Sequence, residues 1–350
     1  MPQQLNDPVV TAFAAGTMLL SVATGLYLLA AWSRGPVLRF LPRAFVPWNA
    51  AGAVLAFVLV LVAVGSALVG HTAPQHDVEE KATQVAPQLI NYIVQEVIVV
   101  GGVLFFVAVY FNATRRDLGL SSNPREFAHD VMIGLVAGLA ALAPVRLIQG
   151  LLLYCLGTPE MQSGHPLVQM LVDGEPNLIV MLLAAFAVVV VAPVCEEITF
   201  RLLLQGWLEK WEAERLGWHD EPSLEVNASG EVRISAADSM TNDEAQMTNE
   251  GTPDSGDSSF VFRHSSLDSP PQRGIAGWPF GWLPIAVSSL LFGLAHFGYG
   301  PEPIPLFFLS LLLGYVYQRT HRIVPCIVAH ALFNLFTVVV LWWMVFHGAK

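Results

Sequence analysis

Long apolar segments constrain the fold of this chain more than any other feature. A transmembrane helix needs about 20 consecutive, mostly apolar residues. Eight segments are candidates: residues 9–32, 47–70, 90–111, 127–156, 177–200, 279–297, 304–318 and 323–346. The fifth continues as a helical tail to residue 216, and the seventh is short enough to be tilted or partly re-entrant. We therefore expect an all-α fold, a polytopic membrane bundle of about eight transmembrane helices.

The composition excludes several classes of protein. Of the 350 residues, 54% are hydrophobic and only 13% are charged, whereas soluble domains carry about 25% charged residues. A soluble enzyme of this size is therefore excluded. The net charge of −11 and the lack of a basic cluster exclude nucleic-acid binding, and three cysteines in apolar runs exclude a disulfide framework. The lipid bilayer is the expected partner.

The arginines predict the orientation of the bundle. Three alternate loops carry eight arginines: residues 33–46, 112–126 and 319–322. The intervening loops hold only Lys81 between them: residues 71–89, 157–176 and 298–303. Short basic loops stay on the cytoplasmic side. We therefore predict an integral, multi-pass protein of a bacterial inner (plasma) membrane, with both termini outside.

One segment interrupts the apolar pattern. Residues 217–278 are rich in Ser, Asp, Glu, Asn, Gly and Pro, and positions 219–275 contain 11 of the 28 acidic residues. Such a segment cannot bury enough apolar surface to offset its ordering entropy. We interpret it as an acidic, disordered insertion on the cytoplasmic side, or alternatively as a regulatory or docking loop. It separates residues 177–216 from 279–346, which together form the expected functional core behind the N-terminal transmembrane helices of residues 1–176.

Ionisable residues inside the spans are the best candidates for function, because each costs about 2.5–3.5 kcal/mol at the membrane centre. The densest group is Glu196, Glu197 and Arg201. Glu197 and Arg201 are four residues apart and can pair on one helix face, whereas Glu196 points about 100° away. Glu197 is thus neutralised structurally and Glu196 is left to face a cavity. The alternative is that all three form one buried salt-bridge cluster.

Two further groups lie at a similar depth. His296 is 14 residues from Trp282, about 21 Å along a helix, and the same spacing separates Glu196 from Lys210. His330 and Asn334 are four residues apart on one helix face. Each histidine alone has a simpler interpretation, as a packing residue for His296 and as part of an interhelical hydrogen-bond latch for His330 and Asn334. Polar groups that converge at one depth instead indicate a hydrated site.

These residue types support two chemistries. A buried carboxylate beside a neutral histidine can hold a water and take its proton, while a second histidine and an amide can stabilise an oxyanion. A glutamate and two histidines could instead hold a catalytic divalent metal such as zinc. The sequence has no HExxH helix, so the common metalloprotease arrangement is absent. The sequence leaves both chemistries open.

The three motifs together resemble those of the CAAX-protease and bacteriocin-processing (CPBP) family of intramembrane proteases. They are EExxxR at residues 196–201, FxxxH at residues 292–296 and HxxxN at residues 330–334. The resemblance covers residues 177–216 and 279–340 and departs from the usual pattern in the long insertion. It implies a hydrolase that acts in membrane proteolysis, with CAAX-type processing of a prenylated substrate as one option.

The resemblance also implies roles for individual residues. Glu196 would activate water with the help of His296, and His330 and Asn334 would bind the oxyanion. The supporting residues would be Glu197, Arg201 and Phe292. If a metal is present, its ligands would be Glu196, His296 and His330; the amide of Asn334 suits a metal-free glutamate mechanism better.

Two other functional classes compete with a protease. A non-catalytic immunity or scaffold protein of the same fold would be expected to lose Glu196 or a histidine, and here all are present. A proton-coupled transporter would be expected to show paired broken helices in two similar halves, and the sequence shows no such symmetry. Of the other ionisable residues within spans, Glu96 and Arg146 are expected to pair with each other.

Overall fold

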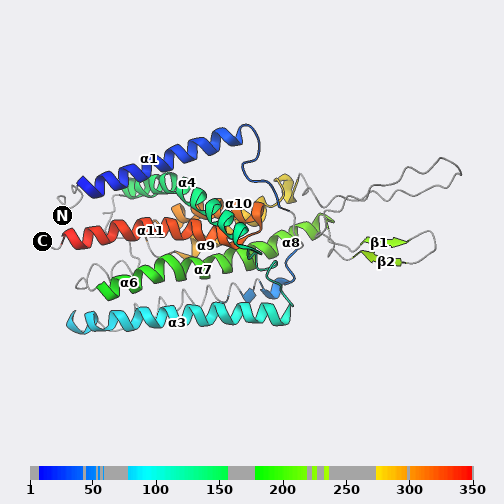
Figure 1. Ribbon diagram of the computed structural model, residues 1–350, viewed down its shortest axis with the longest axis horizontal. Coiled ribbons are helices and arrows are strands. Elements are labelled where there is room, and N and C mark those ends of the chain that lie inside the picture. The colour runs from blue at the N-terminus through cyan, green and yellow to red at the C-terminus, as the bar shows by residue number, and fades with distance from the viewer. Residues whose placement is uncertain are drawn as a thin grey trace.

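The computed structural model describes residues 8–41, 45–52, 54, 55, 58, 78–156, 178–218, 223–226, 232–235, 273–297 and 300–348. Its helices run side by side as a bundle (Figure 1). The helices described before the core include α1 (Pro8–Trp32), α3 (Val78–Tyr110) and α4 (Pro124–Leu156). The predicted segment 47–70 lies largely outside the described residues.

The core begins with one long helical segment in which the spacing of the backbone hydrogen bonds changes between α-helical and π-helical. It comprises α6 (Leu178–Phe186), η3 (Ala187–Val191), α7 (Ala192–Glu197), η4 (Ile198–Gln205) and α8 (Gly206–Arg215), of which η3 and η4 are π-helical. After the insertion follow a 3₁₀ turn at Ile275–Gly277, α9 (Trp282–Ala295), α10 (Pro303–Thr320) and α11 (Ile323–Gly348).

Five described helices are long and apolar enough to cross a membrane. They are Pro8–Trp32, Val85–Tyr110, Pro124–Leu156, Leu178–Arg215 and Ile323–Trp343. The predicted sixth and seventh spans correspond to α9, which is shorter, and α10, which ends in a polar Gln-Arg-Thr sequence. The expectation of an all-helical, multi-pass membrane bundle is confirmed for these five spans.

Two glycines bring α4 and α11 into close contact. A Cβ atom added at Gly134 would lie 2.7 Å from the carbonyl oxygen of Pro325, and one added at Gly138 would lie 2.7 Å from that of Ala329. Small residues four apart allow membrane helices to approach backbone to backbone. This contact fixes α11, the helix that carries His330, against α4.

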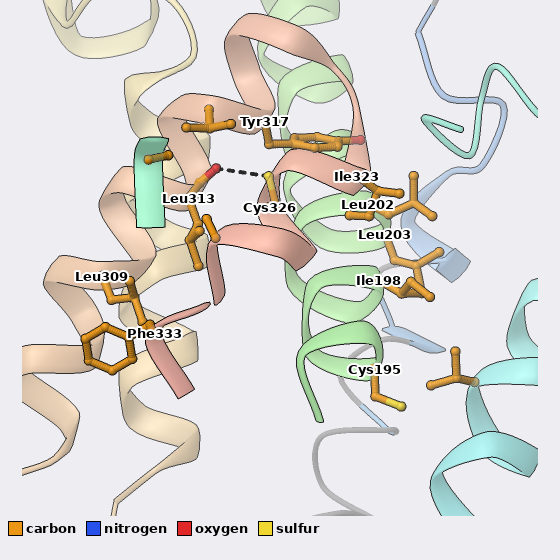
Figure 2. Close-up of a cluster of buried hydrophobic side chains, with 14 of the residues drawn as sticks. Cys195, Ile198, Leu202, Leu203, Leu309, Leu313, Tyr317, Ile323, Cys326 and Phe333 are labelled. Atoms are coloured by element: carbon orange, nitrogen blue, oxygen red, sulfur yellow. Dashed lines mark hydrogen bonds between the residues drawn. The ribbon is translucent and has the colours of Figure 1, made fainter. Parts of the chain in front are cut away.

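Apolar side chains from η4, α10 and α11 meet in the main core (Figure 2). Leu202 and Leu203 of η4, Leu313 of α10 and Cys326 of α11 are almost completely buried there. The Cys326 thiol donates to the carbonyl oxygen of Leu313 at 3.5 Å. The cysteines are free thiols, as the sequence predicts, and Cys326 acts as a small packing residue.

The three arginine-rich loops meet at one end of the bundle. The backbone N–H of Leu41 donates to the carbonyl of Arg319 at 2.9 Å, and that of Ile323 donates to Gly119 at 3.1 Å. The start of α1 and the end of α11 lie together at the opposite end (Figure 1). This arrangement agrees with the loop alternation on which the predicted orientation rests.

The acidic insertion contains a short β-hairpin. Strands β1 (Ser223–Val226) and β2 (Val232–Ser235) pair antiparallel, with Ser223 opposite Ser235. The hairpin projects from the end of the bundle where α8 finishes (Figure 1). Most other residues of the predicted disordered segment lie outside the described part of the chain.

Both ends of the insertion attach to α8. The Glu212 carboxylate accepts hydrogen bonds from the backbone N–H groups of Ile275 at 3.1 Å and Gly281 at 2.8 Å. The rings of Trp218 and Phe280 pack edge to face at 5.2 Å between centroids. The chain therefore leaves and re-enters the bundle at nearly the same place.

Candidate active site

The EExxxR motif lies where the long core helix changes register. In η3 the N–H of Ala192 donates to the carbonyl of Ala187, five residues back, and the N–H of Gly206 after η4 donates to Arg201 in the same way. π-Helical turns are rare and occur frequently at functional sites. The short α7 between them ends at Glu197 and contains Pro193.

Glu197 and Arg201 form a completely buried ion pair. Arg201 Nε donates to Glu197 Oε2 at 2.9 Å, and both side chains are 0% exposed. The guanidinium also donates to Ser288 Oγ at 3.2 Å and to Ser310 Oγ at 2.7 Å. It lies 5.4 Å from the centre of the Phe292 ring. Arg201 thus connects η4 with both α9 and α10.

His330 lies between the two glutamates. Its Nδ1 is 2.9 Å from Glu197 Oε1, and its Nε2 is 3.8 Å from Glu196 Oε2. An ionised Glu197 can only accept, so the hydrogen on Nδ1 points to Glu197. Since Arg201 and Glu197 cancel each other, a protonated His330 would balance the charge of Glu196. We call Glu196, Glu197, Arg201 and His330 the Glu197 cluster.

Glu196 has the freest carboxylate of the Glu197 cluster. Its side chain is 27% exposed, whereas that of Glu197 is 0% exposed. Its Oε2 atom is nevertheless buried and has no hydrogen-bond partner within the described part of the chain. A buried polar atom without a partner is costly and usually has a functional explanation. The spacing argument predicts the same division between a paired Glu197 and an open Glu196.

Phe292 packs against both histidines. Its ring centroid is 5.1 Å from that of His296 and 5.8 Å from that of His330. His296 ends α9, and its Nδ1 donates to the Phe292 carbonyl at 2.9 Å. A neutral His296 therefore keeps its Nε2 lone pair free. The structure places His330, rather than the predicted His296, within 4 Å of Glu196.

Asn334 is bonded to the backbone of η3. Its Nδ2 donates to the carbonyl oxygen of Val188 at 2.9 Å, which leaves the second hydrogen of the amide for another acceptor. The interhelical latch considered for this residue is therefore present, and it does not use up the donor capacity of the amide.

The proposed metal ligands do not form a three-ligand set. Across the described residues, no group of three His, Cys, Asp or Glu side chains is arranged to hold a metal ion. Glu196 and His330 approach each other, whereas the Nδ1 of His296 is engaged with Phe292. A catalytic zinc site needs three protein ligands around one position, so we derive no step through a metal.

The predicted pairing of Glu96 with Arg146 is wrong. Arg146 instead donates to Gln149 Oε1 at 2.7 Å and to Thr337 Oγ1, and Cys195 contacts the backbone carbonyl of Glu96 at 4.0 Å. Glu96 thus lies beside the core helix, whereas Arg146 contacts α11 through Thr337. Spacing within one helix does not determine which neighbouring helix a side chain faces.

Arg146 belongs to a second polar cluster of the bundle. Gln149 Nε2 donates to Glu302 Oε1 at 2.9 Å, which places the amide between the two charged groups. We call Arg146, Gln149, Glu302 and Thr337 the Arg146 cluster. Burial raises the pKa of the Glu302 carboxyl above its usual range, against the opposing charges of Arg146 and His296.

Sequence reasoning missed two residues of the site, Ser288 and Ser310. Each supplies a hydroxyl to Arg201, and Ser288 Oγ also donates to the Phe200 carbonyl at 2.8 Å. The signal in the sequence is a small polar residue in the middle of an apolar span. This signal is not specific, because many such residues only form a hydrogen bond with the backbone of their own helix. Ser288 is thus a support of Arg201.

The fold and the Glu197 cluster define an integral, multi-pass membrane protein whose core helices converge on a buried glutamate, a half-buried glutamate and a histidine. Residues 260–336 match the family model Rce1-like, Type II CAAX prenyl endopeptidase Rce1-like. This match confirms, over these residues, the resemblance predicted from the motifs. Comparisons with curated proteins and with solved structures gave no match.

The matched region contains two of the three motifs, FxxxH and HxxxN, and begins within the acidic insertion. Glu196, Glu197 and Arg201 lie before it. The contacts of His330 with both glutamates connect the first motif to the matched region.

Proposed function

We propose that this protein is an intramembrane endopeptidase in which Glu196 activates a water molecule. The observation that carries the proposal is the buried, unbonded Glu196 Oε2 atom, 3.8 Å from the Nε2 of His330. This distance exceeds that of a hydrogen bond, so the carboxylate is free to bind water.

The remaining residues fit the hydrolysis of an amide bond. Glu196, assisted by His296, takes a proton from water as the oxygen attacks the scissile carbonyl. His330, protonated on both nitrogens, donates from Nε2 to the oxyanion together with the second N–H of Asn334, and Glu196 returns the proton to the leaving amine. The ion pair of Glu197 with Arg201 holds His330 in place through the 2.9 Å contact at Nδ1. Phe292 keeps the two imidazoles apart.

We further propose how the site meets its substrate. α9 and α10 complete the bundle within the membrane, and the end with the arginine-rich loops faces the cytoplasm. His330 is seven residues from the start of α11, about 10 Å from that end. A membrane-associated protein substrate would reach this depth from the cytoplasmic side, and a prenylated CAAX terminus is the substrate class that the family match supports.

Glutamate replacement tests the proposal. The purified protein in lipid vesicles is given a farnesylated peptide with a CAAX terminus, and product is quantified by mass spectrometry. We expect E196Q to lose at least about 100-fold in rate, because general bases contribute about 10²–10⁴-fold. E126Q is the matched control, since Glu126 pairs with Arg322 at the cytoplasmic end. Full activity of E196Q would overturn the mechanism.

Two further measurements complete the test. Chelation with 1,10-phenanthroline should leave the wild-type rate unchanged, and a loss that added zinc reverses would contradict a water attack driven by glutamate alone. If the wild type does not cleave the peptide, comparison of protein N-termini in cells with wild type and E196Q identifies another substrate. Identical N-termini in the two would refute the protease proposal.

A further inference from the structure

The bond between Asn334 and Val188 has a specific origin in the core helix. Within η3 the hydrogen bonds run five residues back, and at its end the N–H of Ala192 donates to the carbonyl of Ala187. Continuing this register would join the carbonyl of Val188 to the nitrogen of residue 193. Residue 193 is a proline, which has no N–H to donate.

Asn334 supplies the donor that Pro193 lacks. Its Nδ2 is 2.9 Å from the Val188 oxygen, a normal hydrogen-bond length. In a membrane interior an unpaired backbone carbonyl costs several kcal/mol. The amide of α11 therefore closes a gap that the sequence of the core helix itself creates, three residues before Glu196.

We propose that Asn334 is a positioning residue that fixes the turn before Glu196 by replacing the hydrogen bond lost at Pro193. This inference rests on the proposed function and deepens it. One amide hydrogen holds the backbone of η3, and the other remains for the oxyanion. The same bond fixes the distance between α7, which carries Glu196, and α11, which carries His330.

A second-site rescue experiment separates positioning from oxyanion binding. N334A removes both functions. P193A restores a backbone N–H where the π-register needs one, so the double variant N334A/P193A recovers the positioning part alone. We expect the double variant to cleave the farnesylated peptide at least about fivefold faster than N334A. N334A/P87A is the matched control, because Pro87 is an internal proline of α3, and it should show no recovery.

A second readout does not depend on catalysis. Cys195 precedes Glu196 and is only 7% exposed. Loss of the latch in N334A should raise the alkylation rate of Cys195 severalfold, measured by mass spectrometry against the buried Cys326, and P193A should reverse the increase. E196Q should lose activity without this increase.

The outcomes are distinct. Unchanged Cys195 alkylation in N334A, or a double variant no faster than N334A, would overturn the positioning role while leaving the protease proposal intact. If P193A alone is inactive, the alkylation experiment decides. An active E196Q would refute the proposed function, whatever the result for Asn334.

Discussion

The Glu197 cluster and the Arg146 cluster are both polar clusters within one helix bundle, but they balance charge differently. In the Glu197 cluster a guanidinium contacts a carboxylate directly at 2.9 Å. In the Arg146 cluster the amide of Gln149 lies between guanidinium and carboxylate. Arg146 also lies 4.5 Å from the centre of the Phe333 ring, so an aromatic face provides part of its environment.

The difference shows where a charge is structurally obligatory. Glu197 is 0% exposed and depends on Arg201 and His330 for neutralisation. Loss of either partner would therefore leave a buried charge without full compensation. The direct contacts of Arg146 are with the neutral groups of Gln149 and Thr337. Within the part of the chain that the structure describes, the Glu197 cluster contains a buried carboxylate oxygen without a hydrogen-bond partner, that of Glu196. A rigid, neutralised pair beside an open carboxylate is the arrangement expected of a preorganised site.

The largest effect is expected when Arg201 is replaced. R201M leaves the Glu197 carboxylate buried with one partner fewer, and it removes the donor that Ser288 and Ser310 share. Loss of one partner of a buried ion pair costs about 3–5 kcal/mol. We expect a destabilisation of this size, measured by SDS titration of the protein in mixed micelles.

The double variant E197Q/R201M tests the cause. If the cost comes from the uncompensated carboxylate, removing that charge should restore a large part of the stability lost in R201M. The opposite result is a double variant that is less stable than R201M by as much as E197Q alone destabilises the wild type. It would show that packing, rather than charge, stabilises the cluster.

The same substitution at Arg146 should have a smaller effect. R146M leaves behind the neutral hydrogen-bonding groups of Gln149 and Thr337, and it removes the desolvation cost of a buried guanidinium. We expect a change of less than about 1.5 kcal/mol, the scale of an ordinary hydrogen bond, by the same SDS titration. If R146M loses as much stability as R201M, the two clusters do not differ in how strongly they depend on their arginine.

The contacts within single helices were the predictable part of the site. The spacing of Glu197 and Arg201 places them on one helix face, and the structure has them in contact. The lengths of the apolar segments likewise predict the five long spans. Both properties depend on residues near one another in the chain, where helix geometry fixes the result.

Contacts between helices could not be predicted in the same way. The pairing of Arg146 with Thr337, and of His330 with Glu197, depends on how each helix is rotated and how deeply it lies. Gly134 and Gly138 determine how closely α11 approaches α4, but their spacing does not tell which helix they meet.

Removal of the insertion should have the smallest effect. The contacts of the Glu197 cluster come from α7, η4, α9, α10 and α11, and both ends of the insertion are held on α8 by Glu212 and by Trp218 against Phe280. Replacing residues 220–272 with a short Gly-Ser linker should therefore change the stability of the protein by less than about 0.5 kcal/mol, the range of neutral surface changes. E212Q in the full-length chain is the companion variant, because it weakens the anchor without shortening the chain. Membrane insertion and SDS titration measure the effect, and a deletion that destabilises as much as R201M would mean that the insertion, and not the helix core alone, holds the glutamates in place.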